Sequence, residues 1–87
     1  MYEIHITVDV SKASIASQVA RDYKWKTSEI ARDPVLGNKN FFYLTKYKST
    51  FFEAFETMQE CIEALADLDV SILREKIEHI VHDIKHV

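Results

Sequence analysis

One unbroken alternation of apolar and polar residues stands out in the sequence: Tyr2-Glu3-Ile4-His5-Ile6-Thr7-Val8-Asp9. Because successive side chains of a strand point to opposite faces, this alternation predicts a β-strand with one buried face. The apolar face would pack into the core and consists of Tyr2, Ile4, Ile6 and Val8. The opposite face would carry ionisable and hydroxyl groups, namely Glu3, His5, Thr7 and Asp9. This polar row is the first candidate for a functional surface.

The composition indicates a single small globular domain that spans residues 1–87. Hydrophobic residues make up 47% of the chain and charged residues 29%, with one Gly and one Pro, so regular structure should cover most of it. The formal net charge of -3 argues against general nucleic-acid binding, which needs a surplus of basic residues. The single cysteine, Cys61, excludes an intrachain disulfide and a cysteine-based zinc site. Without a signal peptide or an apolar run of bilayer length, we expect a cytoplasmic protein that does not bind membranes.

The residues after this first strand predict a helix, a short strand and a loop. Ser11 is the candidate N-cap of a helix that runs to about Tyr23. The inner face of this helix would hold Ile15, Val19 and Tyr23. Residues 25–30 have the alternation of a second strand. Residues 32–40 contain the only Pro, the only Gly and two Asn, and they predict the main loop.

An aromatic third strand at residues 41–48 precedes the second helix. Thr50 and Glu53 have the spacing of a capping box, which predicts that this helix begins after Thr50. Its apolar stripe would be formed by Phe51, Phe55, Met58, Ile62 and Leu65. The opposite face is acidic, which is typical of a solvent-exposed helix surface. Cys61 lies beside the stripe, where we expect a buried and unreactive thiol.

Residues 69–87 have two interpretations. Five apolar residues follow helical spacing, namely Val70, Leu73, Ile77, Ile80 and Ile84. β-Branched side chains, however, favour a strand from about residue 70 to residue 83, and they are supplied by Ile72, Ile77, Ile80 and Val81. A strand completes the order strand, helix, strand, strand, helix, strand, in which one sheet face can pack against both helices. We therefore predict an α+β fold: a ferredoxin-like sandwich with a four-stranded antiparallel sheet and two helices on one face.

Two motifs resemble a family of small α+β proteins of bacteria and bacteriophages. They are Glu-Ile-His-x-Thr-Val at residues 3–8 and Arg-x-Lys-Ile-Glu at residues 74–78. Residues 25–34 are similar to the phage members of this family. The resemblance covers nearly the whole chain and implies that the second motif is a strand. The family carries no established activity, so the resemblance implies a fold and no function.

In a ferredoxin-like sheet the first strand is central and the fourth strand is its neighbour. The open sheet face would then collect Glu3, His5 and Thr7 from the first strand, and Arg74, Lys76 and Glu78 from the fourth. Arg and Lys bind phosphate and carboxylate groups, and His exchanges protons near neutral pH, so these residues form a candidate ligand-binding site. A base-stacking site would be favoured if aromatic residues reach the same face, the candidates being Trp25, Tyr43 and Tyr47. The alternative is a solvated ladder of cross-strand salt bridges that binds no ligand.

The triplet His5-Ile6-Thr7 resembles half of the signature of the two-histidine phosphoesterases. In that family, paired strands each present a His and a Thr or Ser to a phosphodiester. The other candidate triplet, His79-Ile80-Val81, has Val where the hydroxyl is required. Catalysis by His5 and Thr7 would therefore need a homodimer that brings two copies of His5 together.

The sequence predicts no metal site and no cofactor. His79, His82 and His86 would share one face of a helix with metal-binding spacing. On a strand, residues 79 and 82 point to opposite sides and form no such site. Residues 32–37 lack the glycine pattern and the Lys-Ser or Lys-Thr pair of a P-loop, which excludes a nucleotide hydrolase of that class.

These observations favour a cytoplasmic binding module of a bacterial or phage-infected cell, without catalytic residues. We expect it to bind a small phosphorylated or nucleotide-like ligand, or a protein partner, through the polar sheet face. The alternative function is that of a phosphodiesterase. We also expect a homodimer, because the open sheet face and the aromatic third strand would otherwise be left to solvent.

Overall fold

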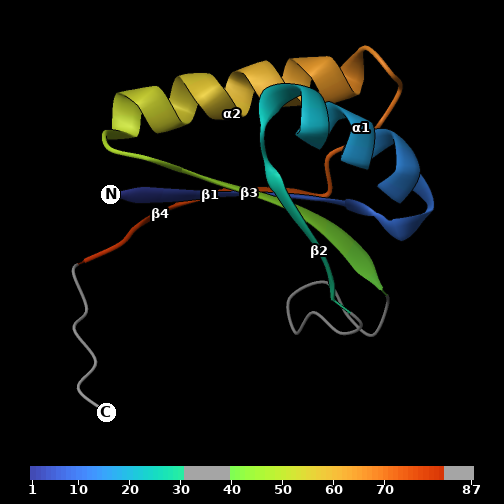
Figure 1. Ribbon diagram of the computed structural model, residues 1–87, viewed down its shortest axis with the longest axis horizontal. Coiled ribbons are helices and arrows are strands. Elements are labelled where there is room, and N and C mark those ends of the chain that lie inside the picture. The colour runs from blue at the N-terminus through green and yellow to red at the C-terminus, as the bar shows by residue number, and fades with distance from the viewer. Residues whose placement is uncertain (31–39, 82–87) are drawn as a thin grey trace.

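The computed structural model describes residues 1–30 and 40–81. Along the chain these residues form β1 (Tyr2–Asp9), a 3-10 turn (Val10–Lys12), α1 (Ala13–Tyr23), β2 (Lys26–Ile30), β3 (Phe41–Lys48), α2 (Phe51–Ala66) and β4 (Arg74–His79). The sheet has four strands in the order β2-β3-β1-β4, and every neighbouring pair is antiparallel. Both helices lie over the same face of this sheet (Figure 1). The predicted α+β, ferredoxin-like fold is confirmed.

The core lies between this sheet face and the helices. Ile4, Ile6 and Val8 of β1 are completely buried, which confirms the alternation in the first strand. The side chains that pack around them include Phe42 and Leu44 of β3, Val19 of α1, and Met58 and Leu65 of α2. Burial of these apolar side chains is the main favourable contribution to folding, and it fixes which face of β1 remains available for a ligand.

Helix α2 begins where the capping box predicts, but it packs with a different face. The backbone N–H of Glu53 donates to the Thr50 hydroxyl over 3.1 Å, so Thr50 is the N-cap. The buried positions are Ala54, Met58, Cys61 and Leu65, whereas Phe51 and Phe55 are 54% and 46% exposed. At 3.6 residues per turn, this face is rotated by about 50° from the predicted stripe. The small side chains of Ala54 and Cys61 allow the helix to approach the sheet closely. The rings of Phe51 and Phe55, if they stood at the centre of this contact, would prevent such a close approach.

Helix α1 differs from the prediction in its cap and in its inner face. The carboxylate of Asp9 accepts a hydrogen bond from the Ser11 backbone N–H over 2.9 Å, and this bond stabilises the 3-10 turn. The helix begins only at Ala13, so Ser11 is not its N-cap. Its buried residues are Ala16, Val19 and Ala20, while Ile15 and Tyr23 are 36% and 37% exposed. Val19 is buried as predicted, and the small residues Ala16 and Ala20, which lie beside the predicted face, complete the buried surface in place of Ile15 and Tyr23.

The strand interpretation of the C-terminal segment is correct, although β4 is shorter than predicted. Its six residues pair with β1 over the register Tyr2↔His79 to Thr7↔Arg74. Backbone hydrogen bonds in this ladder outweigh the helical spacing of the apolar residues, because β1 would otherwise be left with an unpaired edge. Positions 82–87 and all of the predicted loop at 32–40 except Asn40 lie outside the described residues. Within the described ranges, no helix is long and apolar enough to cross a membrane.

Candidate functional site

The sheet face opposite the helices, which we call the open face, is organised in three cross-strand rows. The strand register defines these rows, and β1 is central to each of them. The first row is Tyr47, Glu3 and Glu78; the second is Lys26, Thr45, His5 and Lys76; the third is Ser28, Tyr43, Thr7 and Arg74. The structure therefore brings together all six residues predicted for the ligand-binding face.

A cavity of about 200 Å³, which we call the sheet pocket, spans the second and third rows. Its lining consists of His5, Thr7, Ser28, Tyr43, Thr45, Arg74 and Lys76. Two of these side chains are cationic, four carry hydroxyl groups, and none is a carboxylate. Such a lining is suited to an anion, which both cations attract and the hydroxyl groups can bind as hydrogen-bond donors.

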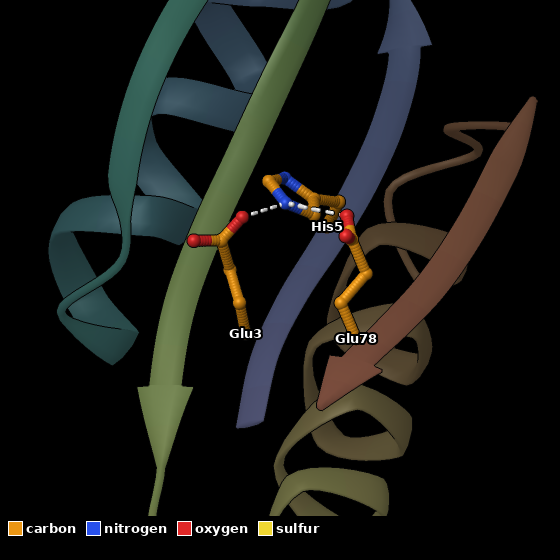
Figure 2. Close-up of side chains that lie close together, drawn as sticks. All are labelled: Glu3, His5 and Glu78. Atoms are coloured by element: carbon orange, nitrogen blue, oxygen red, sulfur yellow. Dashed lines mark hydrogen bonds and ion pairs between the residues drawn. The ribbon is translucent and has the colours of Figure 1, made fainter. Parts of the chain in front are cut away.

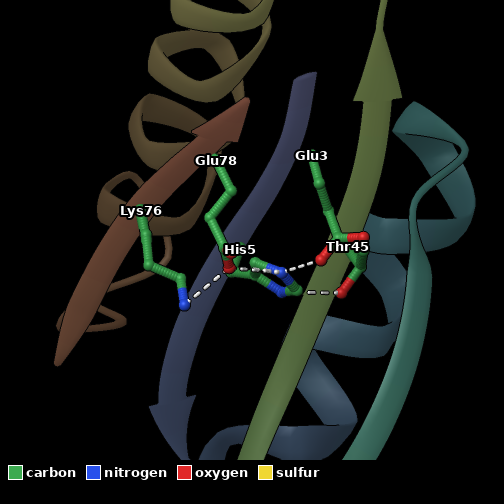
Figure 3. A network of polar contacts seen from close by, with 5 residues as sticks. All are labelled: Glu3, His5, Thr45, Lys76 and Glu78. Carbon is green, nitrogen blue, oxygen red and sulfur yellow. Dashed lines mark hydrogen bonds and ion pairs between the residues drawn. The ribbon is translucent and has the colours of Figure 1, made fainter. Parts of the chain in front are cut away.

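His5 is held from both sides of its ring. Its Nε2 contacts Oε1 of Glu3 and lies 3.6 Å from Oε1 of Glu78, so two carboxylates approach the same nitrogen (Figure 2). On the other side, Nδ1 lies 3.3 Å from the Thr45 hydroxyl (Figure 3). An Nε2–H group donates to Glu3, and the Thr45 hydroxyl can either donate to Nδ1 or accept from an Nδ1–H group.

The two cations of the sheet pocket have different surroundings. Lys76 Nζ lies 2.6 Å from Oε1 of Glu78 (Figure 3), and the hydrogen bond and charge of this ammonium lower the pKa of Glu78. The Arg74 guanidinium, by contrast, makes no side-chain hydrogen bond or ion pair with another described residue, although its charge contributes to the lowered pKa of Glu78. This guanidinium is therefore the cation with the greater capacity to bind an added anion.

The salt-bridge ladder and the ligand site overlap only in the second row. The ladder crosses the first two rows and consists of Glu3, His5, Lys76 and Glu78. The Glu3 carboxylate also accepts a hydrogen bond from the Tyr47 hydroxyl, and this bond raises the pKa of Tyr47. The sheet pocket extends instead toward Arg74 and Thr7 in the third row. The two interpretations of the sequence are thus compatible, with His5 and Lys76 belonging to both.

The three aromatic candidates are placed in different environments. Tyr43 lines the sheet pocket and is 8% exposed. Tyr47 lies on the open face beside the pocket and is 41% exposed, with Lys26 Nζ 6.0 Å from its ring centre. Trp25 is part of the core on the other face of the sheet, so it is not available for stacking. Of the three, only Tyr47 has the exposure that base stacking requires.

Two lining residues were missed by the sequence analysis. Alternation within 41–48 places Thr45 on the same face as Tyr43, so its position was readable from the sequence. Ser28 enters the site only because β2 pairs with β3 in the register Ser28↔Tyr43. That register depends on a long connection whose geometry local sequence patterns do not determine.

Metal-ligand and nucleophile candidates were also located. Among the described residues, one group of three potential metal ligands converges, and it consists of Glu3, His5 and Glu78. Their ligand atoms all lie within 4.8 Å of one another. The His79 ring stacks on Tyr2 with centres 4.8 Å apart, and the other two residues of the predicted His cluster lie outside the described ranges. Cys61 is completely buried, as expected for an unreactive thiol.

The sequence matches no family model, and no curated protein is significantly similar to it. The resemblance to small bacterial and phage proteins therefore stays a prediction. Function has to be argued from the open face itself.

Proposed function

We propose that the protein is a non-enzymatic binding module for a small phosphorylated or nucleotide-like ligand, and that it acts in the cytoplasm of a bacterial or phage-infected cell. The observation that supports this proposal is the lining of the sheet pocket, which combines Arg74 and Lys76 with four hydroxyl groups and contains no carboxylate. A pocket with that lining attracts anions through its two cations and places no lining carboxylate against them.

Each group has a distinct role toward a phosphate. Arg74 is the bidentate partner, because its planar guanidinium matches two phosphate oxygens. Lys76 adds a point charge, and Thr7, Ser28 and Thr45 donate hydroxyl hydrogens. A cavity of about 200 Å³ is smaller than the roughly 300–1,000 Å³ typical of whole small-molecule sites. The phosphate would thus lie within the sheet pocket, while a base attached to it would extend onto exposed Tyr47.

Phosphodiester hydrolysis is the second candidate, and His5 argues against it. Both ring nitrogens of His5 already contact protein groups, Glu3 on one side and Thr45 on the other. A general acid or base needs one nitrogen facing the substrate, and the described part of the open face offers no second His to complete a pair. A hydrolase would need the partner copy of a homodimer to supply that group.

Titration with inorganic phosphate, mononucleotides, and cyclic and linear dinucleotides tests the proposal. We expect Arg74→Ala and Lys76→Ala each to weaken ligand binding about tenfold or more, and His5→Ala to weaken it less, because charge-assisted hydrogen bonds are the stronger ones. Isothermal titration calorimetry would measure the affinities. The matched control is Arg21→Ala, which removes the same charge from an exposed position of α1. Absence of binding to the parent protein, or turnover abolished by His5→Ala, would overturn the proposal.

We also propose that two copies associate. Phe41 and Tyr43 of the third strand are only 4% and 8% exposed within one chain, so this strand leaves mainly Tyr47, 41% exposed, to solvent. Further support comes from β4, which among the described residues pairs with β1 alone, and from Phe51, Phe52 and Phe55 at the start of α2, which are 54%, 71% and 46% exposed. Light scattering at micromolar concentration should give twice the chain mass of 10.2 kDa. A monomeric mass would contradict this expectation.

A further inference from the structure

We propose that Glu3, His5 and Glu78 form a binding site for a divalent metal ion of the Zn²⁺ type. The site lies beside the sheet pocket and does not depend on the proposed anion binding. The sequence alone predicts no metal here, because its only metal-like spacing is that of the His residues near the end of the chain. The residues that converge come instead from two neighbouring strands.

The arrangement follows from the sheet register. Glu3 and His5 are two residues apart on β1 and so share a face, and Glu78 of β4 is directly opposite Glu3. Both carboxylates turn toward Nε2 of the imidazole (Figure 2), and the three ligand atoms lie within 4.8 Å of one another. Two paired strands hold the backbone of all three residues, so the group is preorganised to a degree that loop residues rarely reach.

A count of protons shows why a cation suits this group better than a proton does. Nε2 carries at most one hydrogen, which can serve one carboxylate, and here it contacts Glu3. The Glu78 oxygen is left 3.6 Å away. Like charges placed directly opposite each other on adjacent strands also repel. A divalent ion between the three side chains would bind the imidazole and both carboxylates at once and would remove that repulsion.

The surroundings of His5 are those of a metal ligand. When Nε2 binds a metal, the imidazole proton must be on Nδ1, and the Thr45 hydroxyl, 3.3 Å from Nδ1, can accept it. Such an outer hydrogen bond fixes the ring orientation of most metal-binding histidines. Imidazole nitrogen and carboxylate oxygen are both zinc ligands, and a site with three protein ligands leaves the fourth position of a tetrahedral zinc ion to water. The imidazole favours Zn²⁺ over Mg²⁺ and Ca²⁺, which prefer oxygen ligands alone.

Lys76 competes with the metal for Glu78. Its ammonium lies 2.6 Å from the same Glu78 oxygen, so an incoming ion must displace this ion pair. The Glu78 side chain is 47% exposed and can rotate without disturbing the core. Lys76 would then be released toward the sheet pocket, whose lining it shares with Arg74.

Titration of the metal-free chain with zinc, measured by isothermal titration calorimetry, tests the site. We expect one Zn²⁺ per chain at this site, with Glu3→Gln and Glu78→Gln each weakening the affinity at least tenfold, because loss even of an outer partner costs about 10–100-fold. Glu75→Gln is the matched control: it makes the same change on the same strand, but its backbone is paired with that of Ile6 and its side chain points away from the open face. Its zinc affinity should equal that of the parent.

Nitrogen NMR of the imidazole rings provides a second measurement. Zinc should shift the Nε2 resonance of His5, and a tenfold excess of Mg²⁺ should leave it unchanged. Zinc uptake that neither Gln substitution weakens would place the ion elsewhere, for example on the other His residues, and would overturn the proposal. Absence of zinc uptake by the parent chain would overturn it as well.

Discussion

Replacing Ile6 with alanine should lower the free energy of unfolding by about 2–5 kcal/mol. Ile6 is completely buried at the centre of β1, where its backbone pairs with Leu44 of β3 and Glu75 of β4. The substitution removes apolar contacts and leaves a cavity that the sheet cannot close, because strands on both sides hold the backbone in place. For a domain of this size, each kcal/mol lowers Tm by roughly 4–8 °C. Urea denaturation followed by circular dichroism would measure the loss.

Ile15→Ala is the control for this prediction. It removes the same atoms from a side chain of α1 that is 36% exposed. We expect a change below about 1 kcal/mol, because much of this side chain is already in contact with water and alanine is the better helix former. Equal losses for the two variants, or an unchanged urea midpoint for Ile6→Ala, would contradict the assigned core.

The same position of Ile6 explains why the fold was predictable. Ile6 lies between His5 and Thr7, and a shift of one residue in register would turn both polar side chains toward the helices and the apolar ones toward the open face. The alternation of β1 therefore fixes its inner face, the position of the helices and the identity of the open face together. The predicted strand order also located the cationic residues of the site, because β4 lies beside β1 and places Arg74 and Lys76 next to Thr7 and His5.

The helix faces were less predictable. Size and hydrophobicity correctly predicted Met58 and Leu65 as core residues of α2, but Ala54 and Cys61 are buried beside them in place of Phe51 and Phe55. Close packing against a sheet depends on the complementary shapes of both surfaces, and one sequence pattern describes only one of them. The metal-ligand group was missed for a related reason, since Glu3 and Glu78 are far apart in sequence and meet only through the register of two strands.

Cys61 should react with iodoacetamide at pH 8 on the order of a thousandfold more slowly in the native protein than in urea. Its side chain is completely buried, and burial raises the pKa of the thiol to about 12. At pH 8 about one thiol in ten thousand would be ionised, compared with about a quarter at the ordinary pKa of roughly 8.5. Mass spectrometry at timed intervals would give both rates. Similar rates in the two conditions would contradict the burial of Cys61 and the packing of α2.

The shift in the pKa of Cys61 also has a consequence for stability. The unfolded chain loses this proton near pH 8.5 and the native protein only near 12, so the stabilisation is complete below about pH 8.5 and decreases as the pH rises toward 12. Thermal unfolding of the parent should therefore show a decrease in Tm over this range that Cys61→Ala reduces. A pH profile of Cys61→Ala identical to that of the parent would contradict the linkage.

Slow labelling of Cys61 also gives the zinc experiment an internal check on folding. Thiolates are strong zinc ligands, but the native protein keeps this thiol, the single cysteine of the chain, protonated and buried, so zinc bound by folded protein is not bound by sulfur. A Glu3→Gln or Glu78→Gln variant that labels as slowly as the parent has kept its core. Weaker zinc binding by such a variant then reports the loss of a ligand on the open face, because unfolding would have exposed Cys61 and accelerated its labelling.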